Sequence, residues 1–119
     1  METQQMDRKI DAYKIGVGHL SETMPAAIEA YHRFTGECFK GGALSEREKQ
    51  LIGLGIALFA NNEVCTYYHV QEALSRGATP EQVAEAAAVA AAACSGHAMS
   101  QGVTRVQSAL EAQLRNGAH

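Results

Sequence analysis

Apolar residues recur at helical spacing along the chain, and no stretch alternates convincingly between apolar and polar residues. Near the end, for example, Val103, Val106, Leu110 and Leu114 are spaced so that they lie on one face of a helix. Short breaks separate these patterns, so the sequence predicts an all-α fold of about six helices. The expected helices cover much of 7–20, then 25–39, 46–59, 63–75, 80 onward through the alanine run 84–93, and a last helix around 103–114.

Particular residues mark where these helices begin and end. Ser45 and Glu48 match a capping box, in which each side chain accepts a hydrogen bond from the other residue's backbone N–H. Thr79 and Gln82 match a second box, and a proline between them occupies the first helical position. Gly77 is expected to end a helix in the left-handed conformation.

Glycines inside the helical patterns indicate two further features. Gly53 and Gly55 lie within the third predicted helix, where each costs roughly 1 kcal/mol relative to alanine. Their presence suggests a close crossing with another backbone. Ser95 and Gly96 are expected to interrupt the helix that contains the alanine run and to separate it from the last helix.

The composition fits one small domain, residues 1–119. Hydrophobic residues make up 46% of the chain and charged residues 19%, a balance typical of globular proteins. There is no tryptophan and only 6% of the residues are aromatic, so each helix has little bulk with which to fill a core. We therefore expect a compact, closely packed bundle, helped by contacts with neighbouring subunits.

Charge and apolar runs exclude several classes of protein. A net charge of -3 and the lack of any Lys/Arg run argue against nucleic acid as a partner. The longest uncharged apolar run, 51–60, is far shorter than the ~20 residues that a membrane-spanning helix needs. The first residues lack the pattern of a secretory signal, and three cysteines are expected to be thiols. We therefore predict a cytoplasmic protein.

Cys65 and His69 are the strongest candidates for chemistry. They are four residues apart at the start of a predicted helix, so their side chains lie on one face. The imidazole would remove the thiol proton, and the helix N-terminus would stabilise the thiolate, a nucleophile towards peroxides or disulfides. Taken alone, this spacing is more typical of a buried cysteine and an unrelated histidine than of a reactive pair.

Three stretches carry a resemblance to a known family. They are residues 44–52 (LSEREKQLI), 65–69 (CTYYH) and 73–83 (ALSRGATPEQV). Together they resemble the core of the carboxymuconolactone decarboxylase family, which includes alkyl hydroperoxidase D, over about half of the chain. The resemblance implies a helical fold and a homo-oligomer, commonly a trimer or hexamer, in which helices of neighbouring subunits complete the core.

In the peroxidase-like branch of the family, the resemblance implies that Cys65 attacks peroxide and that His69 is the conserved histidine of the motif. The motif's first cysteine is replaced by Asn62, and its glutamate by Gln50. Without a neighbouring cysteine, Cys65 cannot form a local disulfide, and Gln50 cannot accept a proton at neutral pH.

Other polar residues are candidates to support this pair. Glu46 is one turn before Gln50, and Glu72, three residues after His69, is placed to orient the imidazole. Each carboxylate alone is more typical of a solvated helix charge. Of the adjacent tyrosines 67 and 68, one is expected to pack in the core and the other to line a pocket or a subunit contact, and Tyr68 is our candidate for the pocket.

Cys94 and His97 form a second cysteine–histidine pair. With Cys65 and His69 they make a formal inventory of four zinc ligands, but the spacing is not that of a standard zinc ribbon, so we predict no metal and no cofactor. His97 is a candidate pocket residue, and Cys94 a candidate resolving thiol if it lies close enough to Cys65.

The leading functional prediction is a thiol-dependent peroxidase that reduces a hydroperoxide and is regenerated by an external thiol or by Cys94. One alternative is a lyase acting on a small carboxylated lactone through His69, with Arg47, Lys49 and Arg76 as candidates to bind its carboxylates. The other is a non-catalytic oligomeric member of the family.

Overall fold

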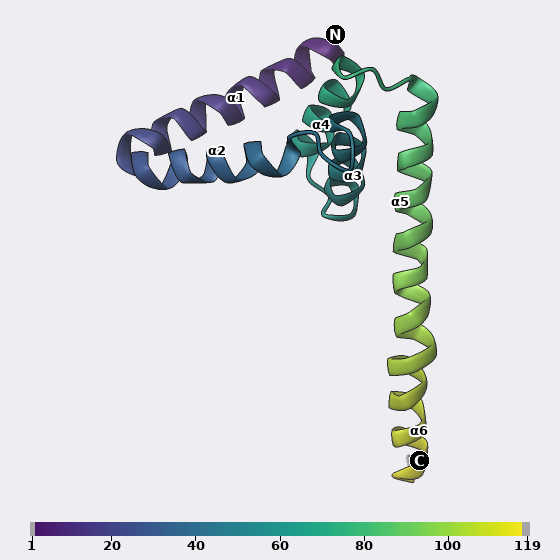
Figure 1. The fold of residues 1–119 in the computed structure, drawn as a ribbon. Coiled ribbons are helices and arrows are strands. Elements are labelled where there is room, and N and C mark those ends of the chain that lie inside the picture. The colour runs from purple at the N-terminus through teal and green to yellow at the C-terminus, as the bar shows by residue number, and fades with distance from the viewer. Residues whose placement is uncertain (1, 118–119) are drawn as a thin grey trace.

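The computed structural model describes residues 2–117, which form helices connected by short turns and contain no strand. Figure 1 shows their arrangement. The all-α class predicted from the sequence is confirmed, with a short π-helical segment in addition. The elements are α1 (Glu2–Thr23), α2 (Pro25–Phe39), α3 (Glu46–Phe59), α4 (Glu63–Ser75), α5 (Pro80–Gln101), the π-helical η1 (Gly102–Val106) and α6 (Gln107–Arg115).

The predicted helix ends are present in detail. At the start of α3, the backbone N–H of Glu48 donates to Ser45 Oγ at 3.0 Å, and that of Ser45 donates to Glu48 Oε1 at 2.8 Å. Thr79 and Gln82 make the same reciprocal pair at the start of α5. Gly77 has a φ of 94°, the left-handed conformation expected after α4.

The predicted interruption at Ser95 and Gly96 is wrong. Helix α5 continues through both residues to Gln101, and the irregularity comes later, as the π-helical η1. The alanine run before them has high helix propensity, and a π-helical turn keeps the backbone hydrogen-bonded without ending the helix. Residues 80–115 therefore form a nearly continuous helix.

The centre of the fold is the pair α3 and α4, with α5 against the other side of α3. The most buried side chains belong to this centre, including Leu54 (2% exposed) and Ala73 (0% exposed). Helices α1 and α2 form a hairpin that projects from it, while α5 extends in a different direction (Figure 1). Ile10 of α1 is also buried, because α1 contacts α4.

The single chain is not the compact bundle that we predicted. Its radius of gyration is 19.9 Å, whereas a compact domain of this length has about 13.5 Å. Its accessible surface is 8623 Å², compared with about 6,200 Å² for a compact protein of 12.7 kDa. The hairpin and α5 point away from the centre, and small side chains cannot draw them together.

The C-terminal arm, defined here as η1 and α6, illustrates this openness. Within residues 2–117, η1 contacts only α5 and α6, and α6 contacts only η1. The apolar residues that predicted this helix are all more than half exposed, although they lie at helical spacing. They are Val103 (57%), Val106 (55%), Leu110 (54%) and Leu114 (74%). No helix of the described chain is long and apolar enough to cross a membrane.

At Gly53, a side chain of α4 packs closely against α3. A Cβ atom at this position would lie 2.7 Å from Cε1 and 2.9 Å from both nitrogens of the His69 ring. The predicted close approach is therefore present, but the neighbour is an imidazole and not a backbone. At Gly55 the nearest atom is the Ala90 Cβ of α5 at 3.8 Å, an ordinary contact.

Gly53→Ala is expected to destabilise the protein by about 1–3 kcal/mol, because the added methyl group would displace the His69 ring. Gly55→Ala is the matched control on the same helix, and it is expected to stabilise the protein by up to about 1 kcal/mol through helix propensity. Urea unfolding followed by circular dichroism measures both. Equal effects of the two substitutions would contradict the described contact.

Candidate functional site

His69 is held by contacts on several sides. Its Nδ1 lies 2.7 Å from Oε1 of Gln50, which is only 3% exposed. The Phe39 ring stacks on the imidazole at a centroid distance of 5.6 Å, and Tyr68 approaches edge-on at 5.4 Å. An amide oxygen only accepts hydrogen bonds, so in this arrangement Nδ1 carries the proton and Nε2 keeps a lone pair.

The protonation of His69 follows from its surroundings. Burial lowers the pKa of the imidazole below its ordinary value of 6.5, and the nearby Glu72 carboxylate only partly opposes this effect. The ring is therefore neutral at neutral pH. A neutral imidazole with a free Nε2 is able to accept a proton.

Cys65 lies in the first turn of α4, where it is half-buried and forms no disulfide. Its backbone N–H donates to Oδ1 of Asn62 at 2.9 Å, so Asn62 is the N-cap of this helix. Asn62, which replaces the first cysteine of the family motif, thus fixes the helix start from which Cys65 projects. Its side-chain oxygen is engaged in that cap.

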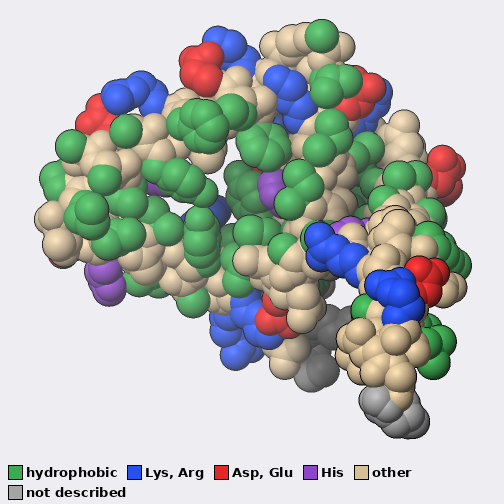
Figure 2. Space-filling view, turned by 90° about the horizontal axis from the view of Figure 1, so that it is seen from below, with side chains coloured by type: hydrophobic (Ala, Val, Ile, Leu, Met, Phe, Trp, Pro, Cys, Tyr) green, Lys and Arg blue, Asp and Glu red, His purple; other side chains and the backbone are tan. Residues whose placement is uncertain are grey.

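A cavity of about 810 Å³ brings the predicted site residues together between the hairpin and the α3–α4 pair. Figure 2 shows a hollow in this region, bordered largely by hydrophobic side chains. Seven of the residues singled out in the sequence share this cavity: Cys65, His69, Gln50, Glu46, Tyr68, Glu72 and Arg76.

The cationic candidates for binding a carboxylated substrate are mostly occupied. Arg76 lines the cavity, but it pairs with Glu72 at 2.5 Å and with Glu46 at 3.8 Å. The Nζ of Lys49 donates to the carbonyl oxygens of Cys38 and Lys40 and thereby caps the end of α2. Two of the three predicted carboxylate-binding residues therefore have partners within the chain.

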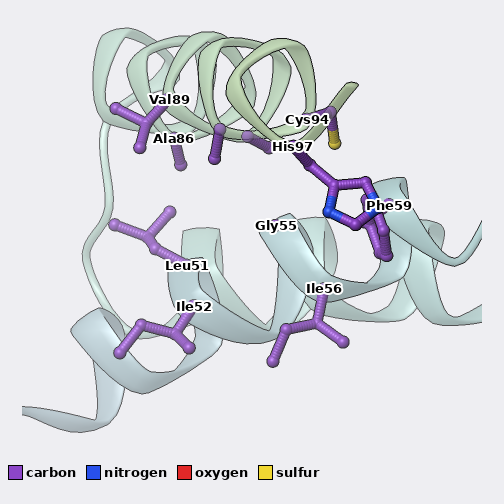
Figure 3. Close-up of a pocket in the computed structure, with 11 residues that line it drawn as sticks. Leu51, Ile52, Gly55, Ile56, Phe59, Ala86, Val89, Cys94 and His97 are labelled. Atoms are coloured by element: carbon purple, nitrogen blue, oxygen red, sulfur yellow. The ribbon is translucent and has the colours of Figure 1, made fainter. Parts of the chain in front are cut away.

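Cys94 and His97 line a different cavity, of about 570 Å³, between α3 and α5 (Figure 3). There the His97 ring meets Phe59 edge-on at 5.7 Å. Neither Cys65 nor His69 lines this cavity. Cys94 and His97 therefore do not reach the Cys65 cavity. Helix α3 lies between the two cavities, and the uninterrupted α5 carries Cys94 and His97 on the far side of α3 from Cys65.

The four residues considered as zinc ligands are therefore also separated into two pairs. Cys65 and His69 line one cavity while Cys94 and His97 line the other. Within the described part of the chain, no group of three or more Cys, His, Asp or Glu residues is arranged to hold a metal ion.

The contribution of the hairpin was not predicted from the sequence. Tyr13 of α1 and Tyr31 and Phe39 of α2 line the cavity opposite Cys65 and His69. The only signal in the sequence was helical spacing, since Tyr13 follows the buried Ile10 by three residues. Which helix face meets the site depends on how the hairpin packs, and local patterns do not encode it.

Gln50→Glu restores a carboxylate beside Nδ1 and is expected to raise the pKa of His69 by about 1–3 units, because a nearby negative charge favours the imidazolium. Gln107→Glu, on the C-terminal arm, is the matched control and should leave this pKa unchanged. An NMR titration of the His69 ring measures both. An unchanged or lowered pKa in Gln50→Glu would contradict the described hydrogen bond.

Several known proteins are similar to this chain in sequence or fold. A crystal structure of a protein from Methanobacterium thermoautotrophicum matches with a TM-score of 0.66 and 37% identity, covering 71% of this chain and 94% of that one. An uncharacterized protein of Cupriavidus necator is 32% identical over 60% of this chain, and uncharacterized protein 4 in the cox locus of Paracoccus denitrificans is 36% identical over 63%. These matches span 64% and 68% of the two relatives' own lengths.

The model of one protein family matches residues 25–112, which run from the start of α2 into α6 and include the whole Cys65–His69 segment. The match therefore contains the central helices α3 and α4, and it omits the whole of α1. The chain belongs to the carboxymuconolactone decarboxylase family.

Proposed function

We propose that the protein is a thiol-dependent peroxidase of the cytoplasm, in which Cys65 is the nucleophile and His69 is the base. The observation that carries this proposal is that the half-buried thiol of Cys65 and the neutral imidazole of His69 line one cavity. A free thiol and a base in a shared, partly apolar cavity are the minimum that thiol-based peroxide reduction requires.

The proposed reaction begins when Nε2 of His69 takes the proton of Cys65. The thiolate, stabilised by the N-terminus of α4, attacks the terminal oxygen of a hydroperoxide. An S–O bond forms, the O–O bond breaks, and the leaving oxygen departs as an alcohol after gaining a proton. Two equivalents of an external thiol then reduce the sulfenic acid to the thiol, releasing water and a disulfide.

An external thiol is part of the proposal because of where the other cysteines lie. Cys94 lines the cavity on the opposite side of α3, and Cys38 is exposed on α2. Asn62 replaces the neighbouring cysteine that would otherwise resolve the sulfenic acid. The occupied side chains of Arg76 and Lys49 favour this chemistry over the decarboxylation of a carboxylated lactone, which needs free cations.

We also propose that the protein works as a homo-oligomer, a trimer or a hexamer. The chain exposes about 2,400 Å² more surface than a compact protein of its mass, whereas a typical stable interface buries about 800 Å² on each partner. The C-terminal arm presents four apolar residues that its own chain leaves exposed. Contact with other copies would cover them.

Cys65→Ser is expected to abolish the formation of sulfenic acid when the protein is treated with an alkyl hydroperoxide, because no other thiol opens into the cavity beside His69. Cys38→Ser, which removes an exposed thiol, is the matched control and should react as wild type does. Trapping of sulfenic acid followed by mass spectrometry measures both. Equal trapping in wild type and Cys65→Ser would refute the proposed nucleophile.

The double variant Val106→Asp/Leu110→Asp is expected to shift the protein towards the monomer, because charges would replace apolar contacts between copies. Ser108→Asp adds a charge to the same helix outside the apolar stripe and should leave the assembly intact. Sedimentation equilibrium gives the masses. A wild-type mass of 12.7 kDa at every concentration would rule out the proposed assembly.

A further inference from the structure

Helix α1 is not part of the segment that matches the family, yet it forms one wall of the Cys65 cavity. It is fixed to α4 by several contacts. Lys9 pairs with Glu63 at 2.5 Å, and Gln71 donates to Asp7 at 3.1 Å. Ile10, the residue after Lys9, is only 4% exposed. Helix α1 is therefore held against α4 by an ion pair, a hydrogen bond and the burial of Ile10.

Tyr13, which is 49% exposed, lines the cavity from this wall. It is three residues after Ile10, about one turn along the same face of α1, and it shares the cavity with Cys65 and with Tyr31 of α2. Burial raises the pKa of the Tyr13 phenol, and interactions with Tyr31 and Cys65 raise it further. The phenol is therefore protonated at neutral pH and lies within electrostatic range of the thiol.

The geometry of peroxide reduction gives such a phenol a role. The thiolate attacks one oxygen of the hydroperoxide from the side opposite that atom's bond to the other oxygen, which leaves. The sulfur, the attacked oxygen and the leaving oxygen are therefore in line. Cys65 and His69 both lie on α4, which forms one wall of the cavity, whereas α1 and α2 form the facing wall. The leaving oxygen of a bound hydroperoxide would therefore point towards α1 and away from His69.

We propose that Tyr13 is a second catalytic residue, which donates its proton to the leaving oxygen as the O–O bond breaks. The proposal rests on the proposed peroxidase function. The products of this step are the Cys65 sulfenic acid, a neutral alcohol and a Tyr13 phenolate. The proton that His69 took from the thiol then returns to the phenolate through solvent, so both groups regain their starting states.

The test compares two oxidants that differ in their need for this proton. The leaving group of tert-butyl hydroperoxide is an alkoxide, which must be protonated, whereas peracetic acid releases acetate, which is stable as an anion. In Tyr13→Phe, oxidation of Cys65 by tert-butyl hydroperoxide should slow by about 100-fold, while oxidation by peracetic acid should stay within about twofold of wild type. Stopped-flow measurement with excess oxidant gives both rates.

Two controls separate a chemical effect from a structural one. Tyr67→Phe is the matched variant, because Tyr67 is also near Cys65 on α4 but donates to Glu63 and does not line the cavity. It should react with both oxidants as wild type does. Alkylation of Cys65 by iodoacetamide releases iodide, which needs no proton, so its rate in Tyr13→Phe should equal that of wild type if the cavity is intact.

The outcomes distinguish this inference from the function on which it rests. If wild type reacts with tert-butyl hydroperoxide and Tyr13→Phe reacts equally fast, the role of Tyr13 is wrong and the peroxidase function stands. Equal slowing with both oxidants, or with iodoacetamide, would assign Tyr13 a structural role and would also overturn the inference. Failure of wild-type Cys65 to react with tert-butyl hydroperoxide would reject both proposals.

Discussion

The packing of the His69 imidazole against the bare backbone at Gly53 is the contact on which the site depends. Any side chain at position 53 would occupy the volume of the ring, since even a Cβ would lie within 2.9 Å of its nitrogens. The same approach places Nδ1 against Gln50 and turns the remaining nitrogen into an available base. A helix glycine, which costs stability locally, thus leaves the space that the histidine ring occupies.

The two departures from the peroxidase-like motif have structural roles in this chain. Gln50 is a neutral partner for Nδ1, so it orients His69 without stabilising the imidazolium, and burial is free to keep the ring uncharged. Asn62 caps α4 through the backbone N–H of Cys65. The chain therefore keeps a cysteine and a histidine at the motif's positions but has no second cysteine beside Cys65, which is why the proposed peroxidase reaction includes an external thiol.

Local features of the fold could be predicted from the sequence because their causes are local. Capping boxes at Ser45 and Thr79 depend on residues three positions apart, and the left-handed Gly77 depends only on its own backbone. The α4 pair of Cys65 and His69 could be placed on one face for the same reason. Ser95 and Gly96 misled the prediction, because strong helix propensity before them and the later π-helical turn outweigh a weak breaker.

The remaining features depend on how distant helices pack. No local pattern indicates that α3 separates Cys94 from Cys65, or that Tyr13 of α1 lines the same cavity as Cys65. The open shape of the chain could not be read from composition either, although the scarcity of large side chains agrees with it. The grouping of residues around each cavity and the open shape both depend on long-range contacts, which the order of residues along one helix does not specify.

The most direct test of the central claim, that His69 serves as the base for Cys65, is the pH dependence of Cys65 alkylation in wild type and in His69→Ala. The account predicts that wild type reacts faster at about pH 7 and that the difference disappears near pH 10, where a thiol ionises without help. Superimposable rates across this range would show that the sulfur and the imidazole act independently, and would contradict the account.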